Sequence, residues 1–309
     1  MQYFLPHTGI FCPVCNKHLY SLDTAITTEN MNANICFYCY SNIDVRNYLL
    51  QSMDTNNIFL FNNIFVGFGF SVVCFSEDVS NAEINLIDLK KYGIKETSKI
   101  IQIITTPTGS CFPAILSKNN WNLDFSQTTQ LRIIGFSLQE KISQGVLHNL
   151  CQFYLVYYDE EDLNPFESQF MEALENFHKK QYKKMIIPAV CSIELRIKLF
   201  MQSAKIQRPP NIQDKQLLKF LMDDICTKTK TKKLDQYHIN NLARIWGQRD
   251  SIAHSGKLIG NYEFNSAKKH IVSILFILNY IKYLEVCLKI KSKRRGEGRN
   301  IVFGPIPRE

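Results

Sequence analysis

The residues best suited to chemistry lie close together in one apolar-periodic segment, in the stretch from Trp246 to Gly256. Arg249 falls on the apolar stripe of that segment, and a guanidinium left unpaired in a core costs roughly several kcal/mol. It is therefore expected to face a cleft, a partner chain or an anion. Asp250 and His254 are four residues apart, so a continuous helix places them on one face, where the carboxylate could orient the imidazole.

Arg249 and His254 are not expected to stack on one face, because five residues correspond to roughly 140° around an ideal helix. They can converge only if the last turn unwinds or if a second copy of the helix contributes. Ser255 and Gly256 form a natural end for the helix, since Gly tolerates a left-handed C-terminal cap. An imidazole can transfer protons near neutral pH and a guanidinium can hold a phosphate. Together they suit the cleavage of RNA by its own 2'-hydroxyl, which needs no metal.

An Arg with a polar residue directly after it and a His four to six positions from the Arg, near the end of a helix in an all-helical C-terminal domain, resembles the signature of the HEPN superfamily. Arg249 and His254 match the two motif positions and Asp250 matches the polar one, and the resemblance covers about residues 162 to 292. It implies a metal-independent endoribonuclease, a hydrolase of the toxin–antitoxin or antiviral defence type, with these three catalytic residues. It also implies a homodimer whose two motifs share one cleft, a tRNA or mRNA substrate, and a cognate antitoxin or phage-derived trigger.

Two Cys-x2-Cys pairs lie near the N-terminus, formed by Cys12, Cys15, Cys36 and Cys39. This spacing lets four thiolates reach one tetrahedral Zn²⁺, and a four-sulfur site leaves no open coordination position. The zinc is therefore expected to be structural and to hold a small zinc ribbon, which binds either nucleic acid or protein. His18 could replace one thiolate, although a surface histidine is the simpler interpretation. The remaining cysteines are scattered singly and no signal peptide is visible, which predicts a cytoplasmic protein.

The net charge of +8 is distributed unevenly. Residues 1–160 carry 9 Lys and Arg against 13 Asp and Glu, a net charge of −4, and the remainder carries 27 against 15, a net charge of +12. This asymmetry indicates a polyanion partner for the C-terminal half, most simply RNA. Because residues 271–281 are too short an apolar run to span a bilayer, no membrane partner is expected. The lysines directly before the helix of Arg249 are expected to bind the phosphates that flank the scissile bond: Lys228, Lys230, Lys232 and Lys233.

The pattern of the whole chain is that of an α+β multidomain protein. Residues 1–53 are predicted to form the zinc ribbon and a short helix, and residues 54–161 a β-rich, sandwich-like domain with no catalytic constellation. Residues 162–292 are predicted to form an all-α HEPN-like bundle of five helices. Residues 293–309 are predicted to be a basic flexible tail.

A non-catalytic interpretation competes with the ribonuclease. In it, the ribbon and the β-rich domain form an adaptor that binds nucleic acid or protein, and the helical bundle serves only to dimerise. Arg249 and His254 then make interface hydrogen bonds, because an interface carboxylate can also satisfy an arginine on a core stripe. For Glu194, an i,i+4 pair with Lys198 is favoured over a place in a cleft.

Overall fold

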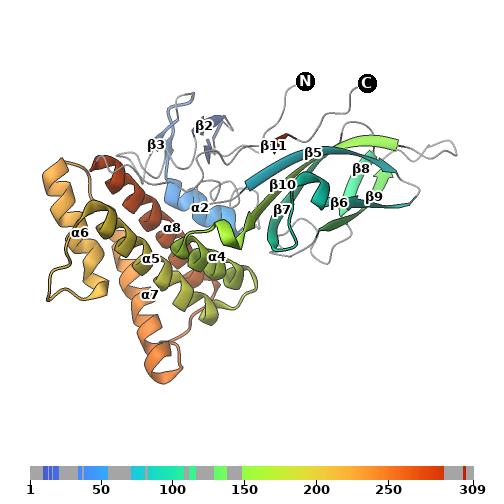
Figure 1. Ribbon diagram of the computed structural model, residues 1–309. Helices are drawn as coiled ribbons and strands as arrows, with labels where there is room; N and C mark the ends of the chain where they lie inside the picture. Colours follow the sequence, from blue (N-terminus) through green and yellow to red (C-terminus); the bar gives the residue numbers. More distant parts are fainter. Residues whose placement is uncertain are drawn as a thin grey trace. The chain divides into compact units, whose positions relative to one another are not determined.

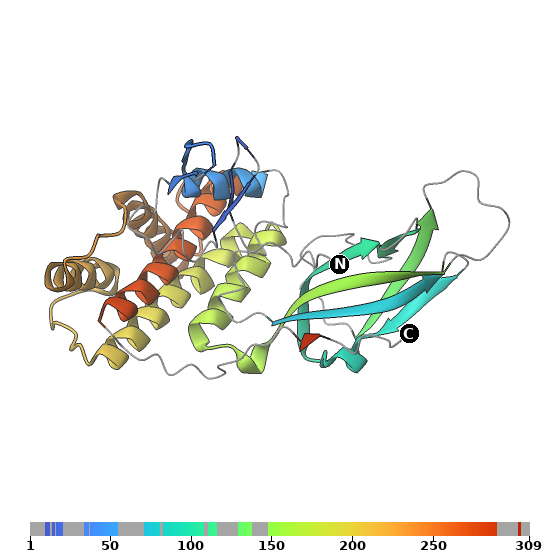
Figure 2. The same cartoon turned by 90° about the horizontal axis from the view of Figure 1, so that it is seen from above.

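The structure is a computed structural model that describes residues 10–12, 14–15, 17–20, 34–36, 38–54, 71–80, 83–107, 111–115, 129–137, 148–288 and 302–303. The chain contains both helices and sheets, and its Cα atoms cluster into two compact units. Among the described residues, one unit holds residues 71–163 with 302–303, and the other holds residues 10–54 with 164–288. Figures 1 and 2 show the sheets of the first unit and the helices of the second.

The first unit is built from two sheets. Their strands are β5 (Ser71–Ser80), β6 (Ile84–Asp88), β7 (Ser98–Pro107), β8 (Cys111–Ile115), β9 (Gln130–Ser137), β10 (His148–Asp159) and β11 (Val302–Phe303). One sheet has the order β11-β5-β10-β7 and the other the order β6-β9-β8. All neighbours are antiparallel except β11 and β5. The β-rich domain predicted for residues 54–161 is described from residue 71 on, and strands β5 to β10 lie within that range.

The two sheets of this unit share one hydrophobic core. Alternate residues of β10, such as Phe153 and Leu155, turn to the same face and meet Leu131 and Ile133 of β9. The ring of Phe75 in β5 stacks on that of Phe153 with centroids 5.2 Å apart. A core enclosed by two sheets is the arrangement that a sandwich-like domain requires.

The strand β11 lies within the segment predicted to be a flexible tail. Val302 pairs with Val73 and Phe303 with Cys74, both in parallel register. These two residues therefore take part in a sheet, because an apolar Val-Phe pair can extend the open edge of β5.

The second unit contains five long helices, as predicted. They are α4 (Pro165–His178), α5 (Tyr182–Ala204), α6 (Asp214–Thr229), α7 (Gln236–Ser255) and α8 (Phe264–Cys287). Asn164 and Pro165 begin α4, where the backbone N–H of Asn164 donates to Glu167 Oε2 at 2.8 Å. Pro188 lies inside α5, so that helix begins before the proline.

Helix α8 is the most buried of the five, with sixteen of its residues in the interior. The helix extends beyond the apolar run of residues 271–281, so by length and composition it could cross a membrane. However, 78% of its most apolar 18-residue window is buried inside the protein. Burial of that extent is typical of the central helix of a bundle. Arg196 of α5 donates to Glu285 of α8 through both terminal nitrogens, at 2.9 and 2.6 Å, and this nearly buried pair joins the two helices.

The cysteine-bearing segment belongs to the same unit as the helices. It comprises two short hairpins, β1 (Ile10–Phe11) with β2 (His18–Tyr20) and β3 (Asn34–Ile35) with β4 (Asn42–Ile43), followed by α2 (Val45–Asp54). Helix α2 packs against α8, and its Val45 and Leu49 are fully buried. The guanidinium of Arg46 lies 4.4 Å from the centre of the Tyr237 ring, which links α2 to the start of α7.

Candidate functional site

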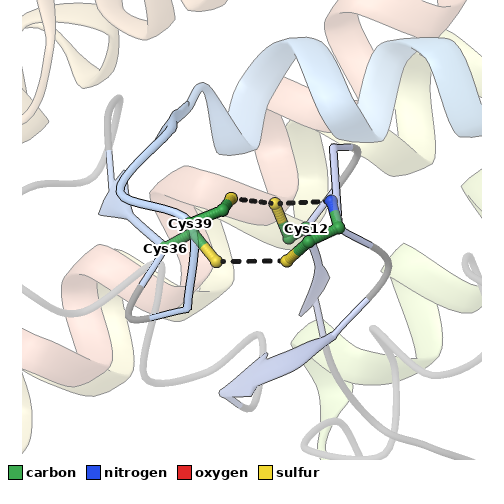
Figure 3. A group of neighbouring side chains, drawn as sticks. Cys12, Cys36 and Cys39 are labelled. Carbon is green, nitrogen blue, oxygen red and sulfur yellow. Dashed lines mark hydrogen bonds between the residues drawn. The ribbon is translucent and has the colours of Figure 1, made fainter.

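The four cysteines of the two pairs converge on one point. All four sulfur atoms lie within 4.8 Å of one another. Cys12 Sγ is 3.5 Å from Cys39 Sγ, and Cys15 Sγ is 3.6 Å from Cys36 Sγ. Figure 3 shows labelled side chains from both pairs directed toward one another. Because metal–sulfur bonds of about 2.3 Å in a tetrahedron imply sulfur separations of roughly 3.8 Å, this cluster could bind a metal ion.

Backbone hydrogen bonds hold the sulfur atoms in place. The N–H of Val14 donates to Cys12 Sγ and that of Tyr38 to Cys36 Sγ, each at 3.4 Å. The N–H of Cys36 closes its turn by donating to the carbonyl of Ser41 at 2.9 Å. These bonds preorganise the ligands before any ion binds. The side chain of His18 lies outside what the structure describes.

Ser41 makes two of the thiols more acidic. Burial alone would raise the pKa of Cys12, but hydrogen bonds with Ser41 Oγ and with the N–H groups of Cys15 and Val14 lower that pKa to about 6. The hydrogen bond with Ser41 Oγ at 3.1 Å also lowers the pKa of Cys39. The pKa of Cys15 shifts the other way: a backbone hydrogen bond with Lys17 lowers it, but burial and the hydrogen bonds with the neighbouring thiols outweigh that effect and raise the pKa to about 12. Thiolates are the form that ligates metals, so Cys12 and Cys39 are the two thiols that this setting prepares for an ion.

Arg249 forms an ion pair with a carboxylate of its own chain. Its Nη2 donates to Glu194 Oε1 at 2.7 Å, and Trp246 Nε1 donates to the same oxygen at 3.2 Å. The Arg249 side chain is 31% exposed and that of Glu194 18%. One oxygen on α5 therefore fixes two donors of α7, while the guanidinium still reaches solvent.

This contact corrects the favoured interpretation of Glu194. Its carboxylate faces α7 rather than the next turn of α5, and it forms no ion pair with Lys198 in the part of the chain that the structure describes. When an acidic residue lies on the apolar side of one helix and a basic residue lies on the apolar side of another, an ion pair between the two helices is indicated. Each charge would be costly to bury alone.

The structure does not bring Asp250 and His254 together, although α7 is continuous through both. Asp250 Oδ1 lies 3.4 Å from Arg249 Nε, so the carboxylate pairs with the adjacent guanidinium and does not orient the imidazole of His254. His254 is exposed and makes no hydrogen bond with any described residue. Helix α7 ends at Gly256 with a φ of 66°, as predicted. Since the last turn stays helical, Arg249 and His254 do not converge within one chain.

The lysine run before α7 lies far from His254. It sits at the N-terminal end of a helix of 20 residues, roughly 28 Å from His254 at 1.5 Å per residue. Two of its members are paired with α6, Lys228 with Asp224 at 2.7 Å and Lys233 with Asp223 at 2.5 Å. The structure therefore does not place this run beside the phosphate that His254 would face.

Comparison with known proteins adds no relative. No protein-family model, no curated protein and no solved structure matches this chain.

Proposed function

We propose that this protein is a metal-independent endoribonuclease of the HEPN type, which acts as a homodimer on tRNA or mRNA in the cytoplasm. As a toxin or an antiphage defence effector, it would be controlled by a cognate antitoxin or a phage-derived trigger. The observation that carries the proposal is that Arg249 and His254, on the last two turns of the rigid helix α7, both reach solvent. A solvent-facing cation and a solvent-facing proton carrier are what RNA cleavage by an internal nucleophile requires.

The reaction forms one bond and breaks another at the same phosphorus. The 2'-oxygen attacks the phosphate and loses its proton to one imidazole, while the bond from phosphorus to the 5'-oxygen breaks and that oxygen gains a proton. The products are a 2',3'-cyclic phosphate and a 5'-hydroxyl. Because one His254 cannot serve both oxygens at once, the second copy supplies the other imidazole. A contribution from two copies agrees with the position of Arg249 and His254 on different faces of α7, from which they do not converge within one chain.

Arg249 stabilises the charge that builds up on the two non-bridging oxygens. The contact with Glu194 uses Nη2 and Nε is buried 3.4 Å from Asp250 Oδ1, so Nη1 is the nitrogen left for a phosphate. Glu194 therefore acts as a positioning residue that sets the rotamer of Arg249. Trp246, which shares the same acceptor oxygen, restricts the carboxylate in turn.

We assign the cysteine cluster to a structural Zn²⁺. Four sulfur donors in a tetrahedral arrangement suit zinc and, as the main competitor, iron in a sulfur cluster. Cys12, Cys15, Cys36 and Cys39 would use every coordination position of one ion, so the metal would hold the ribbon and would have no place for a substrate.

One observation favours the second candidate, a non-catalytic zinc-ribbon adaptor that binds nucleic acid or protein and dimerises through its helices. The Glu194 carboxylate pairs with Arg249 without any bound anion, as it would with a purely structural arginine. The two candidates make opposite predictions for RNA.

Incubation of the purified full chain with total cellular RNA in EDTA separates them. The ribonuclease yields fragments that end in 2',3'-cyclic phosphate and 5'-hydroxyl groups within minutes, whereas the adaptor leaves the RNA intact. An absolute requirement for added Mg²⁺ would exclude the metal-independent route.

A further inference from the structure

A second group of lysines lies at the same end of the bundle as His254. Lys180 follows α4, Lys183 and Lys184 belong to the first turn of α5, and Lys257 follows α7. All four are exposed, and none forms an ion pair with any residue that the structure describes. We call them the α4–α5 lysine cluster.

Direct contacts bring these segments together. Lys183 Nζ donates to the carbonyl oxygen of Gly256 at 2.6 Å, which places an ammonium two residues from His254. Beneath it, the ring of Phe177 from α4 lies 5.8 Å from that of Phe264 at the start of α8. The ring of Tyr182 lies 5.9 Å from that of Phe177. This aromatic packing fixes the backbone from which the lysines project.

One acidic residue near the cluster is already paired, because Glu175 lies 2.5 Å from Lys179. Unpaired like charges repel one another, and the repulsion disappears when a polyanion binds. The lysine run near α6 differs in this respect, because Asp223 and Asp224 lie against it.

The contact of Lys183 also has a purely structural explanation, since a cation stabilises the C-terminal end of a helix. Lys180 and Lys184 make no such contact among the described residues, so that explanation does not extend to them. Both of these side chains are exposed to solvent.

We propose that the α4–α5 lysine cluster is the phosphate-binding surface for single-stranded RNA, contacting the nucleotides next to the phosphate that Arg249 and His254 address. The proposal rests on the proposed function for its choice of ligand. It replaces the lysine run of residues 228–233 as the surface that holds the substrate near the scissile bond.

The test measures binding of a fluorescent, unstructured single-stranded RNA by anisotropy, with the full chain carrying His254→Ala so that no cleavage interferes. The test variant adds Lys180→Gln and Lys184→Gln. A charge-matched control adds Lys205→Gln and Lys219→Gln, two exposed lysines without ion pairs among the described residues. Lys205 caps the other end of α5, roughly 33 Å away along a helix of 23 residues.

The test variant should bind at least about tenfold more weakly at 0.1 M salt. The slope of log K against log salt should fall by about 1.4, or about 0.7 for each lost phosphate contact. The control should change affinity by less than about twofold, because it removes charge without removing a contact. Equal losses in both variants, no loss in the test variant, no RNA binding by the parent, or binding only to anionic lipid vesicles would each overturn the proposal.

This outcome is separable from that of the proposed function. If the wild-type chain does not cleave RNA but the test variant alone loses binding, the ribonuclease fails and the binding surface stands. If the wild-type chain cleaves RNA and the variant with Lys180→Gln and Lys184→Gln keeps its affinity for RNA, the ribonuclease stands and the binding surface fails.

Discussion

At the scale of single residues, Arg249 is the side chain whose setting says most about this protein. The sequence indicated that it must be satisfied, because its position falls on a core stripe. Its partner, Glu194, lies 55 residues away on another helix, and helical periodicity cannot identify a contact at that separation. Both members of the pair were visible as charged residues on apolar faces, so matching such residues across helices is the signal that would have found it.

Removing Glu194 should destabilise the helical unit. In Glu194→Ala, Arg249 and Trp246 lose a shared acceptor, so the free energy of unfolding should fall by about 1–3 kcal/mol. Asp224→Ala breaks the more exposed pair with Lys228 and should cost only about 0–0.5 kcal/mol. Urea titrations of both variants measure the free energy of unfolding. Equal decreases in the two variants would show that the Glu194 contact stabilises the protein no more than the exposed pair does.

Tyr40 has a backbone conformation that favours glycine. Its φ is 57°, and an L-residue in the left-handed region is strained by roughly 1–2 kcal/mol. Its side chain is 80% exposed, so truncation loses little burial. Tyr40→Gly should therefore raise the free energy of unfolding of the ribbon by about 1 kcal/mol. Tyr38→Gly, at a neighbouring exposed tyrosine without positive φ, should give no gain when thermal unfolding midpoints are compared.

At the scale of elements, periodicity and capping residues predicted most of the helices. Gly256 marked the end of α7, because caps act through local backbone chemistry. Periodicity could not predict that α2 packs against α8, since Val45 and Leu49 only show that α2 has an apolar face. The paired strands β5 and β10 are likewise separated by most of the first unit, and register between distant strands depends on tertiary packing.

Helices α7 and α8 carry buried histidines that should make the bundle acid-sensitive. Burial lowers the pKa of His238 and of His270 from 6.5 to about 4. His238 stacks on Phe276 with ring centroids 4.3 Å apart. Between these pKa values the unfolded chain binds more protons than the folded one. The stability is therefore complete above about pH 6.5 and falls as the pH drops toward 4.

The measurement is the free energy of unfolding in urea at pH 7 and at pH 5. We expect a loss of roughly 3–4 kcal/mol over this interval from the two histidines together. His238→Gln should reduce the pH dependence, whereas His254→Gln, at an exposed position, should not. Stability that stays constant between these pH values would contradict the burial of neutral imidazoles.

At the scale of the whole molecule, the ribbon and the helical bundle should depend on each other, because they belong to one compact unit. Cys36→Ser removes one sulfur of four, so bound zinc should fall from one ion per chain toward zero and the folding yield should drop. Mass spectrometry of bound metal and limited proteolysis measure both effects. Cys191→Ser, outside the cluster, is the control, and full zinc content in Cys36→Ser would contradict a four-sulfur site.

Catalysis should not depend on that metal once the chain is folded. Brief treatment with a chelator should leave RNA cleavage running, because the proposed reaction uses the imidazole and the guanidinium alone. The rate before and after treatment is compared with the zinc that remains bound. Loss of cleavage while circular dichroism is unchanged would assign the metal a chemical role.

The central claim is that Arg249 and His254, from two copies of the chain, cleave RNA together. The most direct measurement is the rate at which purified wild-type, Arg249→Ala and His254→Ala proteins release 2',3'-cyclic phosphate ends from single-stranded RNA in EDTA. Dimer mass and circular dichroism are recorded for each. The account predicts that both variants remain folded dimers and that cleavage falls by at least about a hundredfold, the loss expected for a proton-transfer group or a charge-stabilising one. Wild-type rates in both variants would contradict it.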